Sequence, residues 1–286
     1  MSGNENSRDF VRALARGLAV IESFESAPGP VSLSDLAARA KLSRGTVRRA
    51  LLTLQSLGYL HEDDGRFTLT PRTLRLGYSY LSSQPVWTLT RPYVEEVYAQ
   101  TGESTSLSVL DEGMIVYLIR IAAPRLLHDR LTIGSRLPAY PASMGRVLLA
   151  GLSDEALRKY LEETDIRQLT PLTVVDRERI YALIQQARKD GYAVNDQEME
   201  LGLRSIAVPI TAANGTPMAA LNVSCSTVRT SYAEMERNLL PVLREAARKI
   251  SDVLRHAGTQ PASHAAGQRG KAGNPIGSQI GSQLGS

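Results

Sequence analysis

Two short helical patterns that follow each other almost without a break constrain the fold of this chain most. Ser32 is a candidate N-cap with Asp35 at the third position beyond it, and the apolar spacing that follows predicts a short helix. Ser43 can cap the next helix, which the same kind of spacing extends to about Leu57. Two short helices joined by a turn of about three or four residues form the helix-turn-helix arrangement.

The segments on both sides of this pair complete a small domain. Residues 12–24 predict a preceding helix, which the Pro28-Gly29-Pro30 cluster ends. Downstream, the Asp64-Gly65 dipeptide lies between two short alternating runs, which is typical of a β hairpin. A winged helix-turn-helix domain is therefore predicted over residues 8–70. The apolar side chains along one face of its first helix are Val11, Leu14, Leu18, Ile21 and Phe24.

Basic charge is concentrated in the same region. Between Leu36 and His61 the chain has five basic residues and no acidic residue, whereas the whole chain carries a net charge of only +4. Arginine can bind guanine with two hydrogen bonds and threonine can contact a thymine methyl group, so the third helix suits the major groove of DNA. A small helical domain that binds protein is the alternative. The side chains expected to contact DNA are Arg12, Arg16, Ser43, Arg44, Thr46, Arg48, Arg49 and, in the wing, Arg66.

The rest of the chain predicts a linker, a second domain and a tail. Residues 71–86 read as a linker helix, residues 87–256 as a second domain, and the glycine-rich residues 257–286 as a disordered tail. Hairpins with helices between them favour an α+β class with an antiparallel sheet covered by helices. Strands are predicted at 105–110, 114–121, 130–137, 205–211 and 218–224, an extended segment at 192–195, and helices at 89–100, 142–149, 154–163, 177–189 and 233–256.

Composition and motifs argue against an enzyme, a metal site and a membrane protein. No phosphate-binding loop, dinucleotide motif, nucleophile elbow or zinc-protease motif is present, so no catalytic residue and no cofactor is expected. The single Cys225 is expected to be a buried structural thiol. The chain has no apolar run of about 18 residues, and cytoplasmic localisation is expected. The carboxylates Asp196, Glu198 and Glu200 form either a solvated loop or a polar wall that faces a ligand.

Several segments resemble one family. SLSDLAARAKLSRGTVRRALLTLQSLGYL and RALARGLAVIESF resemble the winged-helix domain of the IclR family of bacterial transcriptional regulators. LPAYPASMGRVLLAGL and GYAVNDQEMELGLRSIAVPI resemble its effector-binding domain, so the resemblance covers about residues 8–256. The two effector-domain segments look most like those of the subgroup that controls aromatic-acid catabolism through the β-ketoadipate pathway. That subgroup responds to protocatechuate, 4-hydroxybenzoate or β-ketoadipate.

The resemblance implies a GAF-like effector domain and a homodimer formed through the DNA-binding region, often a dimer of dimers. The chain would then be a ligand-responsive regulator of a catabolic operon that binds a pseudo-palindromic double-stranded DNA operator. A small organic acid would be the effector, and backbone amides at the start of a helix near Met144 would attract its carboxylate. Arg146 is either a pocket cation or a solvent-facing residue. The implied effector-binding residues are Met144, Gly145, Arg146, Asn195, Asp196, Ser205, Asn222 and Ser224.

One departure from the family pattern leaves the effector open. Family members that bind small keto acids tend to have an acidic residue near the position of Asn195, whereas here the acid is the next residue, Asp196. A regulator of another pathway that senses a small keto acid is therefore an alternative. A small-molecule enzyme with a regulatory N-terminal domain is the alternative from a different class.

Overall fold

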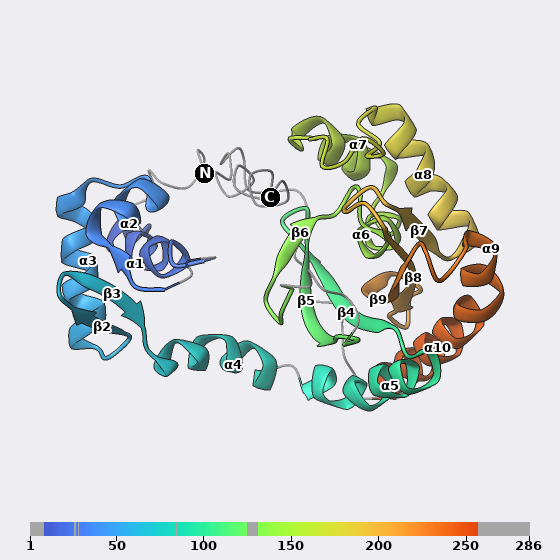
Figure 1. Cartoon of the computed structure of the whole chain (residues 1–286), viewed down its shortest axis with the longest axis horizontal. Helices are drawn as coiled ribbons and strands as arrows, with labels where there is room; N and C mark the ends of the chain where they lie inside the picture. The colour runs from blue at the N-terminus through green and yellow to red at the C-terminus, as the bar shows by residue number, and fades with distance from the viewer. Residues whose placement is uncertain (1–8, 26, 28, 84, 125–130, 257–286) are drawn as a thin grey trace. The chain divides into compact units, whose positions relative to one another are not determined.

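The computed structural model describes residues 9–25, 27, 29–83, 85–124 and 131–256 (Figure 1). These residues divide into two compact units, one that ends with α4 and one that begins with α5. The predicted tail over 257–286 lies outside the described residues. Among the described residues, no helix is long and apolar enough to cross a membrane.

The N-terminal unit is a winged helix-turn-helix, as predicted. Its helices are α1 (Arg12–Glu22), α2 (Leu33–Ala40) and α3 (Arg44–Ser56), and its antiparallel sheet has the order β1-β3-β2. The strands are β1 (Val31–Ser32), β2 (Leu60–Asp63) and β3 (Arg66–Leu69). Ser32 accepts a hydrogen bond from the Asp35 amide at 3.2 Å, and Ser43 accepts one from the Thr46 amide at 3.3 Å. Both predicted N-caps are therefore confirmed.

The first helix differs from its prediction. It ends at Glu22 rather than Phe24, and the short strand β1 that follows it was not predicted. Its buried residue is Val20, while Val11 and Leu14 are more than 60% exposed and Leu18 is 47% exposed. The core formed with α2 and α3 is too small to cover the whole apolar stripe of α1, so part of that stripe faces outward.

The linker helix α4 (Leu74–Ser83) follows a 3-10 turn at Pro71–Thr73. Every side chain of α4 that the structure describes is exposed, including Leu74 at 75% and Tyr78 at 69%. The next helix, α5 (Pro85–Thr101), begins four residues earlier than the predicted start at 89. Proline is compatible with the first turn of a helix, because the amide that it lacks has no partner there.

The C-terminal unit contains a six-stranded antiparallel sheet in the order β6-β5-β4-β9-β8-β7. The α+β prediction with an antiparallel sheet is confirmed. The predicted strand over 130–137 is wrong: β6 covers only Arg136–Pro138, because a turn with Gly134 at φ +88° precedes it. The other strands are β4 (Ser104–Asp111), β5 (Met114–Ile121), β7 (Ala193–Asp196), β8 (Leu203–Thr211) and β9 (Pro217–Ser226).

Helices cover the two faces of this sheet (Figure 1). The helices α5 and α10 (Leu240–His256) pack on one face, and α6 (Ser143–Leu149) packs on the other, where α7 (Asp154–Glu163) and α8 (Arg177–Asp190) add a further layer. The predicted uniform helix over 233–256 is wrong at its start. A short α9 (Tyr232–Glu234) and a π-helical turn (Met235–Leu239) precede α10.

Candidate functional site

The first turns of α3 present the predicted DNA-contacting side chains on one exposed surface. Arg44, Arg48 and Arg49 are exposed, whereas Val47 and Leu51 of the same helix are buried in the core beneath them. The Ser43 and Thr46 hydroxyls lie 2.9 Å apart at the start of the helix. A helix anchored on one side and basic on the other can enter a DNA major groove without disturbing its own core.

The other predicted DNA contacts lie on different elements. Arg12 and Arg16 lie one helical turn apart on α1 and are exposed. Arg66 in the wing donates a hydrogen bond to the Pro30 carbonyl at 3.2 Å, and the wing tip beside it carries the exposed acidic residues Asp63 and Asp64. The wing therefore presents opposite charges side by side, unlike the uniformly basic first turns of α3.

Four of the predicted effector residues meet on the α6 face of the large sheet. Asn195, Ser205 and Ser224 are cross-strand neighbours on β7, β8 and β9, and Asn222 lies two residues before Ser224 on the same strand. Directly paired residues in a sheet point to the same face, as do residues two positions apart. All four are at least nine-tenths buried. The structure thus brings together amide and hydroxyl groups that are separated by nearly thirty residues in sequence.

The helix α6 lies directly above this polar surface. The Ser143 hydroxyl is 2.8 Å from the Ser205 hydroxyl, and the Met144 sulfur accepts a hydrogen bond from Ser108 at 3.1 Å. A Cβ at Gly145 would lie 2.0 Å from the Ala139 carbonyl oxygen. Only glycine therefore allows α6 to pack this closely against the turn that precedes it.

Arg146 does not face solvent, so the alternative that predicted a solvent-facing side chain is wrong. Its side chain is 3% exposed, and its guanidinium donates to Glu198 Oε2 at 2.8 Å and to the Tyr140 and Val194 carbonyls. Glu198 is also buried and accepts a hydrogen bond from the Val174 amide at 3.1 Å. The interpretation of a solvated carboxylate loop is therefore wrong for Glu198, whose charge neutralises Arg146 inside the protein.

The structure does not bring Asp196 to the same surface. It follows Asn195 directly on β7, so its side chain points to the opposite face of the strand. There it makes a two-pronged ion pair with Arg204, with N–O distances of 2.8 and 2.9 Å. Asp196 serves to join β7 to β8 rather than to complete the polar surface.

Sequence reasoning missed four polar residues on the α6 face. Ser104, Ser106 and Ser108 alternate along β4 and are fully buried. Arg120 on β5 pairs with Ser106 in the strand register, and its Nη1 donates to the Ser106 hydroxyl at 2.8 Å. The signal in the sequence was the period-two serine pattern STSLS, which places three hydroxyls on one face of a strand.

Burial shapes the electrostatics around Arg120. Loss of solvent lowers the pKa of its guanidinium, which means that its charged form is less well solvated here than in water. The neighbouring Tyr117 ring lies 5.6 Å from the guanidinium carbon, and burial raises the pKa of that phenol to about 12. Tyr117 is thus a neutral neighbour, and it adds a cation–π contact rather than a counter-charge.

Asn222 has an acceptor that the described residues leave unused. Its Nδ2 donates to the Ser224 hydroxyl at 3.1 Å. Its Oδ1 is buried and has no hydrogen-bond partner among the described residues. Buried polar atoms are nearly always paired in native structures, so this unused acceptor points to a partner other than the described residues.

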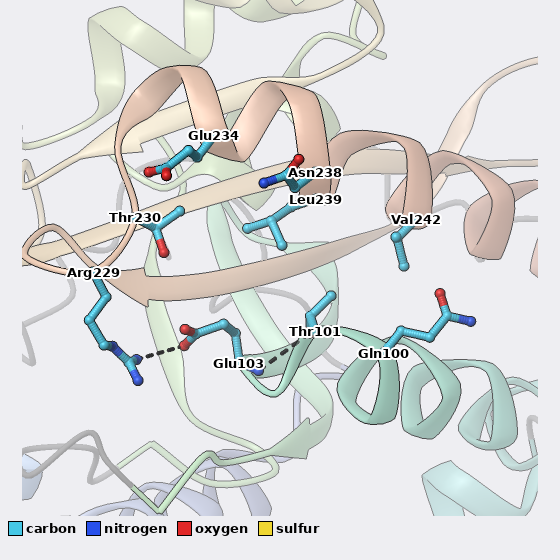
Figure 2. Close-up of a pocket in the computed structure, with 9 residues that line it drawn as sticks. All are labelled: Gln100, Thr101, Glu103, Arg229, Thr230, Glu234, Asn238, Leu239 and Val242. Carbon is cyan, nitrogen blue, oxygen red and sulfur yellow. Dashed lines mark hydrogen bonds and ion pairs between the residues drawn. The ribbon is translucent and has the colours of Figure 1, made fainter.

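A separate pocket of about 300 Å³ lies between the end of α5 and the segment that leads from β9 into the π-helical turn (Figure 2). Most of its lining side chains are polar, but Leu239 and Val242 are apolar, and Arg229 forms an ion pair with Glu103 at 2.9 Å. None of the predicted effector residues lines this pocket.

Cys225 is buried as predicted, and burial raises the pKa of its thiol to about 11.

The chain matches two family models and several characterised proteins. Residues 13–64 match the IclR helix-turn-helix domain, and residues 78–252 match the C-terminal domain of the bacterial transcriptional regulator IclR. The Pca regulon regulatory protein of Pseudomonas putida is 43% identical over 86% of this chain and 85% of its own length. The p-hydroxybenzoate hydroxylase transcriptional activator of Acinetobacter baylyi is 34% identical over 87% of this chain and 93% of its own length.

A solved structure resembles the fold over most of the chain. The crystal structure of an IclR homologue from Microbacterium hydrocarbonoxydans, complexed with 4-hydroxybenzoate, aligns with a TM-score of 0.74 and 28% identity. The alignment covers 85% of this chain and 99% of that chain. The similarity therefore extends through both units.

Proposed function

Because this chain belongs to the IclR family of transcriptional regulators, which are not enzymes, we propose that it controls a catabolic operon in response to an aromatic or dicarboxylic acid. The observation that carries the effector proposal is the buried polar surface on the α6 face of the sheet, formed by Asn195, Ser205, Asn222 and Ser224. Protocatechuate, 4-hydroxybenzoate and β-ketoadipate are the candidate effectors. The names of the Pseudomonas and Acinetobacter relatives and the 4-hydroxybenzoate complex of the Microbacterium homologue support this class.

The DNA-binding unit, residues 8–70, reads a pseudo-palindromic operator as part of a homodimer. Residues 43–49 of α3 enter the major groove, where Arg48 reads a base edge and Arg66 contacts the backbone. A two-fold dimer places its half-sites about one helical turn, roughly 34 Å, apart along the duplex. The exposed apolar side chains of α1 and α4 support dimerisation through this part of the chain.

Effector binding in the unit over residues 87–256 changes DNA affinity through the linker at 71–86. For this to occur, the effector must bind one of two arrangements of the protein more tightly than the other. The linker is the covalent connection between the DNA-binding unit and the effector-binding unit. The regulator acts in the cytoplasm, where the operator and the catabolic acid both occur.

Thermal unfolding of the purified full chain against a ligand panel tests the effector class. The panel contains protocatechuate, 4-hydroxybenzoate, β-ketoadipate, pyruvate, glyoxylate and unrelated sugars. A ligand at 100 times its dissociation constant stabilises the native state by about 2.7 kcal/mol, which raises the melting temperature by several degrees in a unit of this size. A shift with pyruvate or glyoxylate alone would favour the alternative of a regulator that senses a small keto acid.

A further inference from the structure

The direction in which each arginine leaves α3 separates the roles of these side chains. Val47, Leu51 and Leu54 are the buried residues of this helix, so they mark the side that faces the core. Successive residues on an α-helix are rotated by about 100°, which places Arg49 roughly 140–160° away from all three. The same rotation places Arg48 roughly 60–120° from them, at the flank of the helix. Arg49 is therefore the arginine of α3 that points most directly away from the core.

The Arg49 guanidinium is available to a partner molecule. Its side chain is exposed and makes no hydrogen bond or ion pair with the described residues. The guanidinium of Arg39 on α2 is instead engaged within the fold, because it donates to the Glu25 carbonyl at 3.0 Å. Further along the outward face of α3, the Thr53 and Ser56 hydroxyls donate to carbonyls of the same helix. Arg49 is thus the long polar side chain that this face offers to DNA.

Gly45 leaves an open space one helical turn before Arg49. Residues four apart on a helix lie on the same face, and helical side chains lean toward the N-terminus, so this space lies on the side toward which Arg49 extends. A Cβ at Gly45 would meet no heavy atom within 4 Å, and the residue does not have a positive φ. Glycine is less stable than alanine inside a helix, and neither packing nor backbone conformation among the described residues requires it here. The close approach of another molecule to the backbone would require it.

The chemistry of the guanidinium selects one base. In the major groove, guanine presents the acceptors N7 and O6 side by side, which match two parallel N–H donors of an arginine. Adenine presents an acceptor beside a donor, cytosine presents a donor, and thymine presents an acceptor beside a methyl group. An arginine that meets the base edge end-on therefore distinguishes guanine from the other three bases.

Resting on the operator-binding function proposed above, we propose that Arg49 reads a guanine in each half-site and that Gly45 lets α3 come close enough for this contact. Arg49 points to the floor of the major groove, whereas Arg48 reaches a neighbouring position from the flank of the helix. The missing side chain at position 45 allows the first turn of α3 to approach the base edges. Each half of the operator should therefore contain one guanine whose recognition depends on Arg49.

Binding-site selection from a pool of random duplexes tests the reading of guanine. The protein is the full chain, and the selection is run with and without 4-hydroxybenzoate. The native chain should enrich a consensus with two-fold symmetry, and Arg49→Ala should lose the preference for guanine at one position of each half-site while it keeps the other positions. Arg179→Ala is the matched control, because it removes the same charge from an exposed position on α8 and should select the native consensus.

Fluorescence-anisotropy titration on the selected duplex tests the role of Gly45. Gly45→Ala should bind this duplex at least about tenfold more weakly than the native chain. Its melting temperature should be no lower, because alanine favours the helix, so a loss of folding cannot explain the weaker binding. The added methyl group acts by holding α3 away from the guanine. Most of its effect should therefore disappear when Gly45→Ala is introduced into the Arg49→Ala variant.

The outcomes separate this proposal from the one on which it rests. If the native chain enriches no sequence in either condition, operator binding fails and this proposal fails with it. If Arg49→Ala selects the native consensus with every position intact, Arg49 reads no base, and this proposal alone is wrong even where the affinity has fallen. If Gly45→Ala binds the selected duplex as tightly as the native chain, the close approach of α3 is refuted.

Discussion

Replacing Glu198 with glutamine should strongly destabilise the C-terminal unit. The substitution keeps the shape of the side chain and an oxygen that can accept from the Val174 amide, but it removes the charge opposite Arg146. Both partners are more than nine-tenths buried, and the guanidinium would stay inside the protein without a counter-charge. Removal of one partner from a buried pair costs about 3–5 kcal/mol.

This free energy converts into a large thermal shift. A unit of this size loses about 2–4 °C of melting temperature per kcal/mol, so the transition should fall by roughly 6–20 °C in differential scanning calorimetry of the full chain. Glu178→Gln is the control, because Glu178 pairs with Arg158 at 3.4 Å but is 77% exposed. Exposed pairs contribute about 0–1 kcal/mol, so that variant should melt within a few degrees of the parent.

A double variant sharpens the same test. In Arg146→Met/Glu198→Met, both charges are replaced by apolar side chains, which removes the uncompensated guanidinium. Most of the stability lost in Glu198→Gln should return, because buried ion pairs are often replaced by apolar residues at little cost. Equal melting temperatures for Glu198→Gln and Glu178→Gln would refute the reasoning, since burial would then make no difference to the pair.

Four further outcomes follow from the structure. Gly145→Ala should lower the melting temperature by several degrees, because the new methyl would meet a backbone carbonyl oxygen at 2.0 Å, while Gly45→Ala on an open face of α3 should not lower it; similar shifts for both would contradict the close approach of α6. Arg48→Ala should weaken specific operator binding by about 1–3 kcal/mol in a gel-shift titration, and an equal loss on random duplexes would exclude base reading. A Gly/Ser replacement of residues 74–83 should abolish the effect of the ligand on DNA affinity while both bindings persist; a retained effect would exclude α4 as the transmitter. Because burial raises the pKa of Cys225 to about 11, iodoacetamide should not modify the folded protein at pH 8 and should begin to do so only as the pH approaches that value or the protein unfolds; rapid labelling at pH 8 would show that the thiol is accessible.

Local signals in the sequence predicted most elements well. The caps at Ser32 and Ser43 depend on hydrogen bonds three residues away, and the hairpin at Asp64-Gly65 depends on one turn, so each is encoded within a few neighbouring residues. The strand predicted at 130–137 failed because its apolar residues surround a turn at Gly134. The exposure of Val11, Leu14 and Leu18 could not be predicted in this way, since periodicity shows which side chains share a face but not whether one chain can cover that face.

The candidate site was predictable only in part. The Asn222 and Ser224 positions came from the family resemblance, and the strand register that joins them to Ser205 appears only in the folded sheet. Arg146 and Glu198 are 52 residues apart in sequence, so no local pattern could reveal that they neutralise each other. Arg120 was missed because an arginine in a strand is ordinarily read as a residue on the solvent face.

In the proposed homodimer, the exposed surface of α4 would make the linker helix sensitive to protein concentration. A helix of ten residues with no buried side chain among those described is marginal in water, because its own hydrogen bonds barely offset the entropy of ordering it. A second subunit that covers Leu74 and Tyr78 would supply the missing stabilisation. Assembly and helix formation would then be one equilibrium, and dilution would melt the connector between the two units before it unfolded either of them.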